Sequence, residues 1–558
     1  MLDAVTKKKS GSYYTKPEIV SLILDLVGYT TDKPLYNHTL LEPSTGEGAF
    51  LHQIVSRLID SVILKIGPSL FTNEDEMYEL LKEAITSIEI DSTKHSELLS
   101  TVKANLCDRG LSESLSQRLI DKWIIKNNFL LWNKPVIERY NYIVGNPPYI
   151  RIENLDDALE KFYREQYSTL YDRADIYVAF IEHSLEMLHA GGRLGFICTD
   201  RFTKNRYGKE IRTMINQNYR VVHFLDIHNA QAFEDEVSAY PCIFTIENST
   251  RGVSKTLKMD KVTCAHLTAA RDYLILDKTV SRSDIEVHTI TDWFKGSAPW
   301  VLNGEQAHLI LQKLESENKL ITEEPHSIHV GIGVATGAND LYVIHPDVVD
   351  VEREVLLPTV TKEDIKSGVI RWRGYYVINP YKEDGSLINL EDYPKLRSYF
   401  YRHEERVKSR STAKNNPNKW YKTIDRIFPE RLQEAKLLIP DIKSKNLIVK
   451  DEGNYYPEHS LYYITSGTWD IDALQSLLTS SVIKFFIWSY ATKMRGDYLR
   501  YQAQYLRKIR LPVDIKDQDI SELKRLYLEE DYEGIDLVAK KLYNLSDLEL
   551  KEIKDLVQ

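Results

Sequence analysis

The sequence is poor in the features that mark metal sites, disulfide scaffolds and membrane proteins. Its 558 residues include only four cysteines, widely spaced and without a Cys-x-x-Cys pair. This spacing argues against a zinc site and a disulfide framework, and it fits a reducing cytoplasm. No apolar run approaches the length of a membrane span, and the first ten residues carry lysines but no apolar signal stretch. We therefore expect a cytoplasmic protein with no metal site and no membrane partner.

Internal repeats and low-complexity tracts are also lacking. Hydrophobic residues make up 43% of the chain and charged residues 28%, as in ordinary soluble globular proteins. The length allows two or three domains with cores of their own. The formal net charge of −10, taken alone, argues against a nucleic-acid partner, but the basic residues are unevenly distributed along the chain.

The most informative stretch is residues 140–149, an apolar strand that ends in a proline-locked turn. Pro147 and Pro148 fix φ at about −65° and remove two backbone donors, which leaves rigid carbonyl acceptors. Asn146 adds a side-chain carbonyl, and Tyr149 adds a flat aromatic face. These groups suit a planar ring that carries an NH₂, because two acceptors meet its two N–H bonds and the ring has a surface to stack on. An amine held this way turns its lone pair out of the ring plane, and no strong base is needed if the partner is a sulfonium-bound methyl group.

A glycine turn at residues 40–50 is the second motif. A predicted strand ends at Glu42, Gly46 and Gly48 make a tight turn, and a helix is predicted from about Ala49. Glycines here let the backbone approach a ligand at the carboxyl end of a parallel strand. An acid at the strand end accepts from an ammonium group such as that of methionine, whereas a dinucleotide pyrophosphate offers no such donor. The motif therefore argues against an oxidoreductase.

Other stretches predict the rest of a cofactor pocket. Thr15 is a predicted N-cap of a helix, in a loop expected to lie over the cofactor. Residues 85–91 form a predicted strand whose Glu89 is expected to bind a ribose diol. Glu89 lies 89 − 48 = 41 residues past Gly48, so the sequence between them must contain an insertion. Asn128 is placed to offer an amide to the adenine ring of the cofactor.

Strands and helices alternate over residues 40–250, which predicts an α/β fold with a doubly wound parallel sheet, Rossmann-like in organisation. A helix is predicted over residues 175–188, ending in a glycine C-cap at residues 190–192. The Pro-Cys pair at residues 241–242, which in other enzymes marks a nucleophile, lies inside an apolar strand. We therefore expect Cys242 to be a core residue, and Cys198 likewise.

Taken together and in this order, the motifs of residues 11–250 resemble the N6-adenine DNA methyltransferases of the gamma order, the TaqI methyltransferase-like family. The resemblance implies S-adenosylmethionine as cofactor, double-stranded DNA as substrate, flipping of the target base, and a place in a restriction-modification system with a separately encoded endonuclease. The residues that resemble the family's cofactor pocket are Tyr14, Thr15, Glu42, Pro43, Ser44, Thr45, Gly46, Gly48, Glu89 and Asn128.

The resemblance also assigns the chemistry. Asn146, Pro147, Pro148 and Tyr149 look like the catalytic motif, with Tyr149 as one face for the target base. Phe233 is similar in position to the family's second stacking aromatic. The sequence departs from the pattern at Asn128, where the family often has an aspartate.

The second half of the chain is predicted to be organised differently. We expect a methyltransferase domain over residues 1–250, a connector over 251–325, a mixed α+β target-recognition domain over 326–515 and a helical tail over 516–558. Lys and Arg exceed Asp and Glu by 15 to 6 over residues 395–450 and by 7 to 1 over 484–510, with aromatics interleaved. This pattern is typical of a nucleic-acid groove, and an ordinary solvated surface is the alternative. The residues expected to contact DNA are Arg402, Arg406, Arg410, Lys414, Lys419, Arg495, Arg500 and Arg507.

Three other functions share parts of this pattern. Protein-glutamine and RNA-base methyltransferases also use Asn-Pro-Pro-Tyr, but they are usually compact and lack a large C-terminal module. Cytosine-N4 DNA methyltransferases are chemically close, although they more often carry serine in place of Asn146. A DNA-binding protein with a decayed catalytic domain is disfavoured by the intact Glu42, Asn146 and Tyr149.

Overall fold

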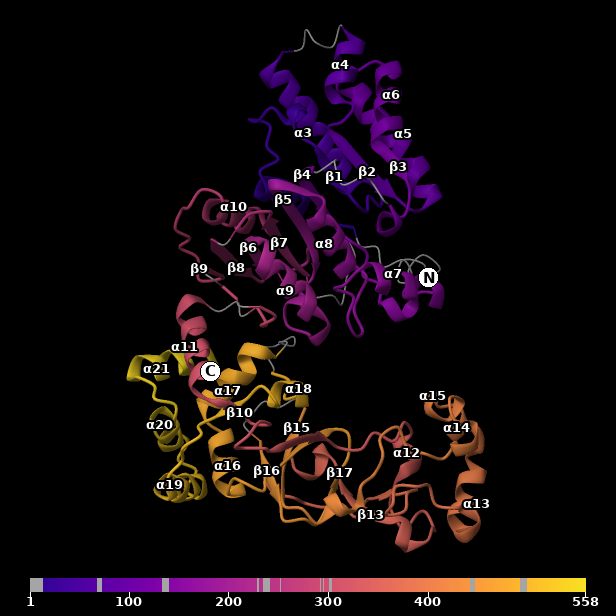
Figure 1. Ribbon diagram of the computed structural model, residues 1–558, viewed down its shortest axis with the longest axis vertical. Coiled ribbons are helices and arrows are strands. Elements are labelled where there is room, and N and C mark those ends of the chain that lie inside the picture. The colour runs from indigo at the N-terminus through magenta and orange to yellow at the C-terminus, as the bar shows by residue number, and fades with distance from the viewer. Residues whose placement is uncertain are drawn as a thin grey trace. The chain divides into compact units, whose positions relative to one another are not determined.

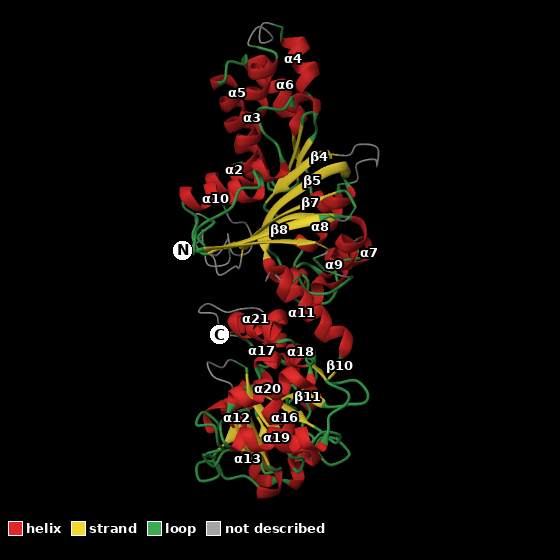
Figure 2. Ribbon diagram, turned by 90° about the vertical axis from the view of Figure 1, so that its left-hand side faces the viewer, coloured by secondary structure: helices red, strands yellow, loops and turns green. Residues whose placement is uncertain are grey.

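The computed structural model describes residues 14–67, 73–132, 140–227, 230–233, 241–250, 252–291, 293–294, 296–300, 304–441, 447–491 and 499–557. The chain forms two compact units that divide between His308 and Leu309 (Figure 1). The first unit is built on one large sheet, and the second combines small sheets with many helices (Figure 2).

One nine-stranded sheet in the order β3-β2-β1-β4-β5-β7-β6-β8-β9 organises the first unit. Its strands are β1 (Leu40–Glu42), β2 (Ile85–Glu89), β3 (Ile124–Lys126), β4 (Tyr140–Gly145), β5 (Leu188–Thr199), β6 (Arg220–Asp226), β7 (Pro241–Glu247), β8 (Val253–Met259) and β9 (Ile285–Thr291). Strands β3 to β5 along this order run parallel, β7 is antiparallel to both neighbours, and β9 is antiparallel to β8. The predicted parallel sheet is confirmed, with antiparallel strands added at one side.

Helices cover both faces of this sheet (Figure 2). They are α2 (Pro17–Val27), α3 (Ala49–Lys65), α4 (Glu74–Leu81), α5 (Ser92–Asp108), α6 (Glu113–Trp123), α7 (Asp157–Gln166), α8 (Tyr177–Glu186), α9 (Lys209–Asn218) and α10 (Cys264–Leu274). Tyr142 and Val144 of β4 join the core that contains α2 and α3, whereas Ile143 joins the core that contains α8 and α9. The alternation follows from the two-residue period of a strand, and it makes the sheet doubly wound as predicted.

The strand order reverses between β1 and β4, since β1 continues to β2 on one side and β4 leads to β5 on the other. In open α/β sheets, ligands bind outside the carboxyl ends of the strands at such a switch point. Glu42 ends β1, and Asn146 follows β4 directly. The fold therefore brings the glycine turn and the Asn-Pro-Pro-Tyr turn to one crevice.

Two boundaries expected from the sequence are wrong. The connector proposed for residues 251–325 instead contains β8, α10 and β9, which extend the sheet, and Arg271 of α10 pairs with Asp25 of α2 at 2.6 Å. These strands were not predicted because polar residues alternate along their sequences. The glycine C-cap expected at residues 190–192 lies inside β5, because α8 ends at Glu186, and Gly191 takes a φ of +76° within the strand.

The second unit is a mixed α+β structure, as predicted. Its sheets have the orders β11-β18-β15-β16, β12-β14-β13-β17 and β10-β19. The strands are β10 (Lys319–Leu320), β11 (His329–Ile332), β12 (Val343–Ile344), β13 (Leu356–Val360), β14 (Tyr376–Ile378), β15 (Lys436–Pro440), β16 (Val449–Asp451), β17 (Tyr456–Pro457), β18 (Leu461–Thr465) and β19 (Arg510–Leu511).

The helices of this half, beginning with α11 in which the division falls, complete the chain. They are α11 (Gly304–Glu317), α12 (Asn339–Tyr342), α13 (Pro394–Arg402), α14 (Glu404–Lys408), α15 (Ser411–Lys414), α16 (Ile471–Leu478), α17 (Ser481–Tyr490), α18 (Ala503–Leu506), α19 (Asp517–Leu528), α20 (Tyr532–Leu542) and α21 (Asp547–Val557). The helical tail packs on the unit, for example through Asp536, which accepts from the backbone and hydroxyl of Ser481 at 2.7 Å. Within the described ranges, no single helix is long and apolar enough to cross a membrane, and α16 with α17 passes that test only as a pair bent by 65°.

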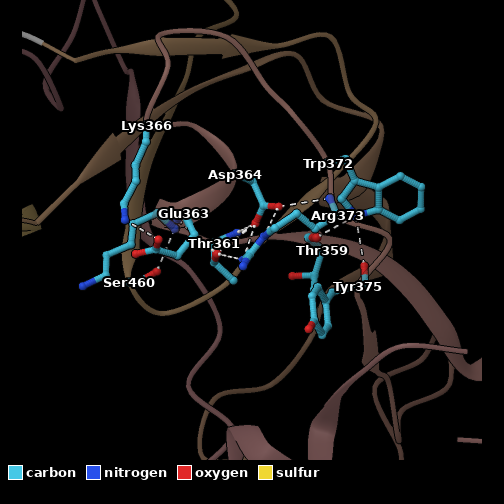
Figure 3. A network of polar contacts seen from close by, with 10 residues as sticks. Thr359, Thr361, Glu363, Asp364, Lys366, Trp372, Arg373, Tyr375 and Ser460 are labelled. Carbon is cyan, nitrogen blue, oxygen red and sulfur yellow. Dashed lines mark hydrogen bonds and ion pairs between the residues drawn. The ribbon is translucent and has the colours of Figure 1, made fainter. Parts of the chain in front are cut away.

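A polar network orders the long loop between β13 and β14, residues 361–375 (Figure 3). Asp364 is buried and accepts from the backbone N–H of Arg373 at 3.1 Å and from its Nε at 2.9 Å. Trp372 donates from Nε1 to the Thr359 carbonyl at 3.0 Å. Because its interior polar groups are satisfied, the loop presents its exposed side chains from a fixed base.

A buried ion pair in the second unit provides a test of its core. Lys436 and Asp451 are almost fully buried and lie 2.9 Å apart. Lys436→Met leaves the Asp451 carboxylate buried without its cation, so we expect a loss of about 3–5 kcal/mol in the free energy of unfolding. Urea unfolding followed by circular dichroism measures it. The exposed helical pair of Lys408 and Glu404 is the control, and Lys408→Met should cost only about 0.3–0.5 kcal/mol. Equal losses in the two variants would contradict this assignment.

Candidate active site

The two predicted motifs meet at adjacent strand ends. Strands β1 and β4 pair in parallel, and the Ser44 hydroxyl beyond β1 donates to the Asn146 carbonyl beyond β4 at 3.1 Å. The glycine turn is tight for a steric reason. Gly48 has a φ of +90°, and a Cβ there would lie 2.7 Å from a methyl carbon of Leu98. Glycine at this position therefore allows α3 to begin directly after the turn.

Residues of strand β2 form hydrogen bonds with the glycine turn. The Glu89 carboxylate accepts from the Gly46 N–H at 2.7 Å through one oxygen and from the Asp91 N–H at 2.8 Å through the other. Thr45 donates from its hydroxyl to the Ile88 carbonyl at 3.1 Å. The insertion inferred between Gly48 and β2 contains α4. The structure thus brings Glu89 to the turn despite the long separation in sequence.

Glu42 is a buried acid with an unsatisfied oxygen. Its side chain has no exposed surface, Oε2 accepts from the Ser87 hydroxyl at 3.3 Å, and Oε1 has no hydrogen-bond partner among the described residues. Burial raises the pKa of the Glu42 carboxyl well above 4.5; the Ser87 hydrogen bond opposes the rise, and the nearby Glu89 carboxylate adds to it. A cationic donor placed at Oε1 would satisfy the oxygen and compensate the charge.

Thr15 sets the orientation of the Asn146 amide. The Asn146 Nδ2 donates to the Thr15 hydroxyl at 3.2 Å, and its Oδ1 accepts from the Tyr149 hydroxyl at 2.7 Å. Thr15 is itself buried and forms a backbone bridge with Phe233. Tyr14, the residue before it, donates its hydroxyl to the Glu47 carboxylate beside the glycine turn. The N-terminal segment therefore lies beside Asn146, although Thr15 is not the N-cap that the sequence predicts, because α2 is capped by Lys16 without a side-chain hydrogen bond.

Two aromatic rings are in contact at the site. The rings of Tyr149 and Phe233 meet edge to face, with centroids 6.4 Å apart and planes at 72°, and Phe233 is 2% exposed. The predicted pair is thus brought together, but in perpendicular rather than parallel orientation. A planar guest stacked between them requires one ring to turn. The residues that follow Phe233, 234–240, lie outside the described part of the chain.

Sequence reasoning missed a chain of hydroxyl groups behind Tyr149. The ring of buried Tyr177 meets Tyr149 edge to face, and its hydroxyl contacts the Tyr207 hydroxyl at 2.9 Å and accepts from Thr199 at 3.2 Å. Tyr207 also reaches the Asp175 carboxylate at 3.5 Å. In the sequence, the only sign of these contacts was the presence of polar residues where an apolar helix begins. The pairing of the strands alone could not place those residues beside β5.

Asn128 makes two contacts within the protein. Its Oδ1 accepts from the Leu130 N–H at 3.0 Å, and its Nδ2 donates to the Tyr163 hydroxyl at 2.8 Å. These contacts cap the short helix of residues 129–131. The contacts of Asn128 thus account for an asparagine without an adenine ring beside it.

The expected DNA-contact residues fall into three groups. Arg402, Lys414 and Lys419 are exposed, and Arg406 is exposed beside Asp340. Arg410 is wrong as a DNA contact, because it is buried and donates to the Thr336, Val407 and Trp420 carbonyls. In the other segment, Arg500 pairs with Asp441 and Arg507 donates to the Val330 carbonyl, while Arg495 lies outside the described residues. Figure 1 shows α13 to α15 at one end of the unit, away from α18, so the two segments do not lie together.

The ordered loop of residues 361–375 was also missed. It carries the exposed cations Lys362, Lys366, Arg371 and Arg373. Its four basic residues are diluted by two acids, so local charge counting gave only a weak signal. Figure 3 shows two of these cations, Lys366 and Arg373, on the anchored loop.

Comparison with known proteins agrees with this geometry. Residues 59–233 match the Eco57I restriction-modification methylase family model, and residues 358–513 match the TaqI-like C-terminal specificity domain. The chain is 47% identical to the type II methyltransferase M.BstVI of Geobacillus stearothermophilus, covering 98% of both chains. It is 39% identical to M.PaeR7I of Pseudomonas aeruginosa, covering 96% of this chain and 92% of that one. It is 37% identical to M.XhoI of Xanthomonas vasicola, covering 97% and 98%.

Among solved structures, the fold is similar to that of the type IIL restriction-modification enzyme MmeI in complex with DNA. The TM-score is 0.64 at 13% identity, covering 97% of this chain and 76% of that one. At such identity the likeness concerns the fold.

The buried acid generates a prediction about stability. The folded-state pKa of Glu42 lies above its unfolded value, so the contribution of its neutral form is complete below about pH 4.3 and is lost as pH rises through the folded pKa. Glutamine cannot ionise, so Glu42→Gln should weaken the decline of unfolding free energy above that pH. Urea titrations at a series of pH values measure the effect, with exposed Glu97→Gln as the control. A Glu42→Gln profile parallel to that of the unmodified protein would contradict the raised pKa.

Proposed function

The chain belongs to the type II restriction-modification DNA methyltransferases, and we propose that it transfers a methyl group from S-adenosylmethionine to adenine N6 at a specific site in duplex DNA. The observation that carries the proposal is the Asn146 amide, which hydrogen-bonds to Thr15 and Tyr149 directly after β4, next to the strand β1 that ends in the buried Glu42. In a restriction-modification system, such methylation protects host DNA from a separately encoded endonuclease.

The proposed chemistry is positioning and charge stabilisation. S-adenosylmethionine supplies a methyl group on a positively charged sulfur. Asn146 Oδ1 and the Pro147 carbonyl accept the two N–H bonds of the target amine, which turns its lone pair away from the ring. If the methyl group passes from sulfur to the amine nitrogen, an S–C bond is exchanged for an N–C bond and the positive charge moves from sulfur to nitrogen. The same two oxygens would stabilise that charge until the nitrogen releases a proton to solvent. Tyr149 supports the ring.

The residues at the glycine turn fit the cofactor. Glu42 Oε1 is a buried acceptor to which no group among the described residues donates, and it could accept from an ammonium group. Each oxygen of Glu89 already accepts one backbone N–H and keeps a second lone pair for a ribose hydroxyl. The other residues proposed to line this pocket are Tyr14, Thr15, Pro43, Ser44, Thr45, Gly46 and Gly48.

Cytosine N4 is the second candidate target, because its exocyclic amine presents the same two N–H bonds. The asparagine at position 146, where N4 enzymes more often have serine, favours adenine. Protein-glutamine and RNA substrates are disfavoured by the match of residues 358–513 to a specificity domain.

The second unit is the proposed site of sequence recognition. The exposed cations of α13 to α15 and of the loop 361–375 are candidates for phosphate or base contacts. Arg410 is excluded from the proposal by the contacts described above, whereas Asn128 stays proposed as a neighbour of the cofactor's adenine ring. Salt-dependent DNA binding by this unit is expected, since each phosphate neutralised contributes to the salt slope.

We predict N6-methyladenine as the product. Duplex DNA incubated with the protein and S-adenosylmethionine is digested to nucleosides and separated by chromatography. Asn146→Ala should lose turnover by about 100-fold or more, since its oxygen acts on the developing charge, while cofactor affinity stays within a few fold. Exposed Asn154→Ala, in the loop that follows, is the matched control. N4-methylcytosine as the sole product would falsify the adenine assignment.

We also predict that the target base leaves the helix and stacks between Tyr149 and Phe233. A paired base cannot reach acceptors at a strand end. With 2-aminopurine at the target position, fluorescence should rise on binding. Phe233→Ala removes one stacking face and should weaken binding of the flipped base by about 1–3 kcal/mol, whereas Phe233→Tyr keeps the face. Unchanged fluorescence on cognate DNA, or equal binding by the alanine and tyrosine variants, argues against the pocket.

A further inference from the structure

Two arginines beside the active site have guanidinium groups that form no hydrogen bond or ion pair with the described residues. Arg151 follows the catalytic turn two residues after Tyr149 and is exposed, and half-buried Arg201 lies two residues after the end of β5. No hydrogen bond or ion pair within the described part of the chain engages either guanidinium, although both act electrostatically on Asp175. Two cationic groups therefore lie at the same edge of the sheet as Asn146, available for an anion.

The backbone fixes their positions. Arg151 forms an antiparallel bridge with Asp175, and this bridge is flanked by hydrogen bonds from the Ile176 N–H to the Ile150 carbonyl at 2.8 Å and from the Ile152 N–H to the Ala174 carbonyl at 3.0 Å. Arg201 lies in the short helix Asp200–Thr203, directly after Thr199, whose hydroxyl donates to Tyr177. Tyr177 in turn contacts Tyr149. Both arginines are thus anchored to the structure that supports the stacking ring.

Neighbouring arginines differ in this respect. Arg173 pairs with Glu153 at 3.1 Å, and Arg206 donates to the Tyr171 hydroxyl at 2.8 Å. Arg151 and Arg201 both act on the Asp175 carboxyl, and Arg201 also acts on Asp200, but burial raises the pKa of both carboxyls in spite of these guanidinium groups. Asp175 therefore does not neutralise them as a tight ion pair would.

The place of the arginines in the sheet indicates which anion they meet. The proposed cofactor groups lie on β1 and β2, on one side of β4, whereas Arg201 follows β5 on the other side. The planar amine enters at Asn146 and Tyr149. An anion next to that ring, on the side away from the cofactor, is the phosphodiester of the nucleotide that carries it.

We propose that Arg151 and Arg201 bind the DNA phosphates that flank the flipped target base. The inference rests on the proposed function and adds a backbone-binding site within the catalytic unit. A guanidinium matches a phosphate with two parallel N–H bonds. Extrusion of a base rotates its sugar and phosphates, so cations fixed to the frame of the stacking ring hold the rotated backbone in place. Such contacts carry no sequence information.

The test measures DNA binding by the full chain at several salt concentrations. Arg151→Ala and Arg201→Ala should each weaken binding to cognate and unrelated duplexes alike. Each should also make the slope of log K against log salt shallower by about 0.9 for each phosphate lost. Arg173→Ala, whose guanidinium is already paired with Glu153, is the matched control and should keep the slope. Arg151→Lys and Arg201→Lys should restore most of it.

A neutral backbone identifies the phosphates. Cognate duplexes carry a single methylphosphonate at each position around the target nucleotide. The unmodified protein should lose affinity at a flanking position, and the matching alanine variant should lose nothing further there. An unchanged salt slope, relaxed preference at one base pair, or additive losses would overturn the proposal. These outcomes do not depend on which base is methylated, and loss of DNA binding by the unmodified protein would instead refute the proposed function. Thermal unfolding of each variant separates misfolding from lost contacts.

Discussion

The hydrogen bond from Asn146 to Thr15 is the constraint on which the site depends. An amide rotated by half a turn would present its NH₂ to a target amine and repel it, so the orientation of the amide decides whether the turn can accept the N–H bonds of an amine. The partners lie 131 residues apart, and the bond exists only because the N-terminal segment lies over the ends of β1 and β4. The backbone bridge from Thr15 to Phe233 ties the same segment to the stacking ring.

The neighbouring strands of the sheet contribute buried polar groups to the same site. Glu42 is fully buried. Each carboxylate oxygen of Glu89 accepts one backbone N–H from a neighbouring turn. A buried carboxyl with one oxygen unsatisfied is unfavourable in the free protein and favourable once a cation arrives. The unfavourable state is tolerated because the flanking strands are buried on both faces, with large cores above and below.

The meeting of the two motifs could be predicted from the sequence because both lie at strand ends. Parallel strands share an edge, so naming the strands that end at Glu42, Glu89 and Asn146 already places these side chains together. Surface roles were harder to predict. Arg410 lies in a basic segment of the kind that contacts DNA, yet its guanidinium donates to three backbone carbonyls. Asn128 caps a short helix. Residue type does not distinguish a cation that neutralises phosphate from one that satisfies the protein's own backbone. The strands β8 and β9 at one side of the sheet were missed because their alternating polar residues made them resemble a connector.

The division into two units separates two physical tasks. Each unit has hydrophobic clusters of its own, so substitutions that change base contacts in the second need not disturb the strand ends that hold the amine in the first. Extrusion of a base, however, is a local event. Its free-energy cost arises at one nucleotide, and it is best offset by groups rigidly attached to the stacking pocket. A recognition surface that varies with the target sequence is a poor place for such groups. If Arg151 and Arg201 hold the flanking phosphates as proposed, the same two cations serve any site that the second unit recognises.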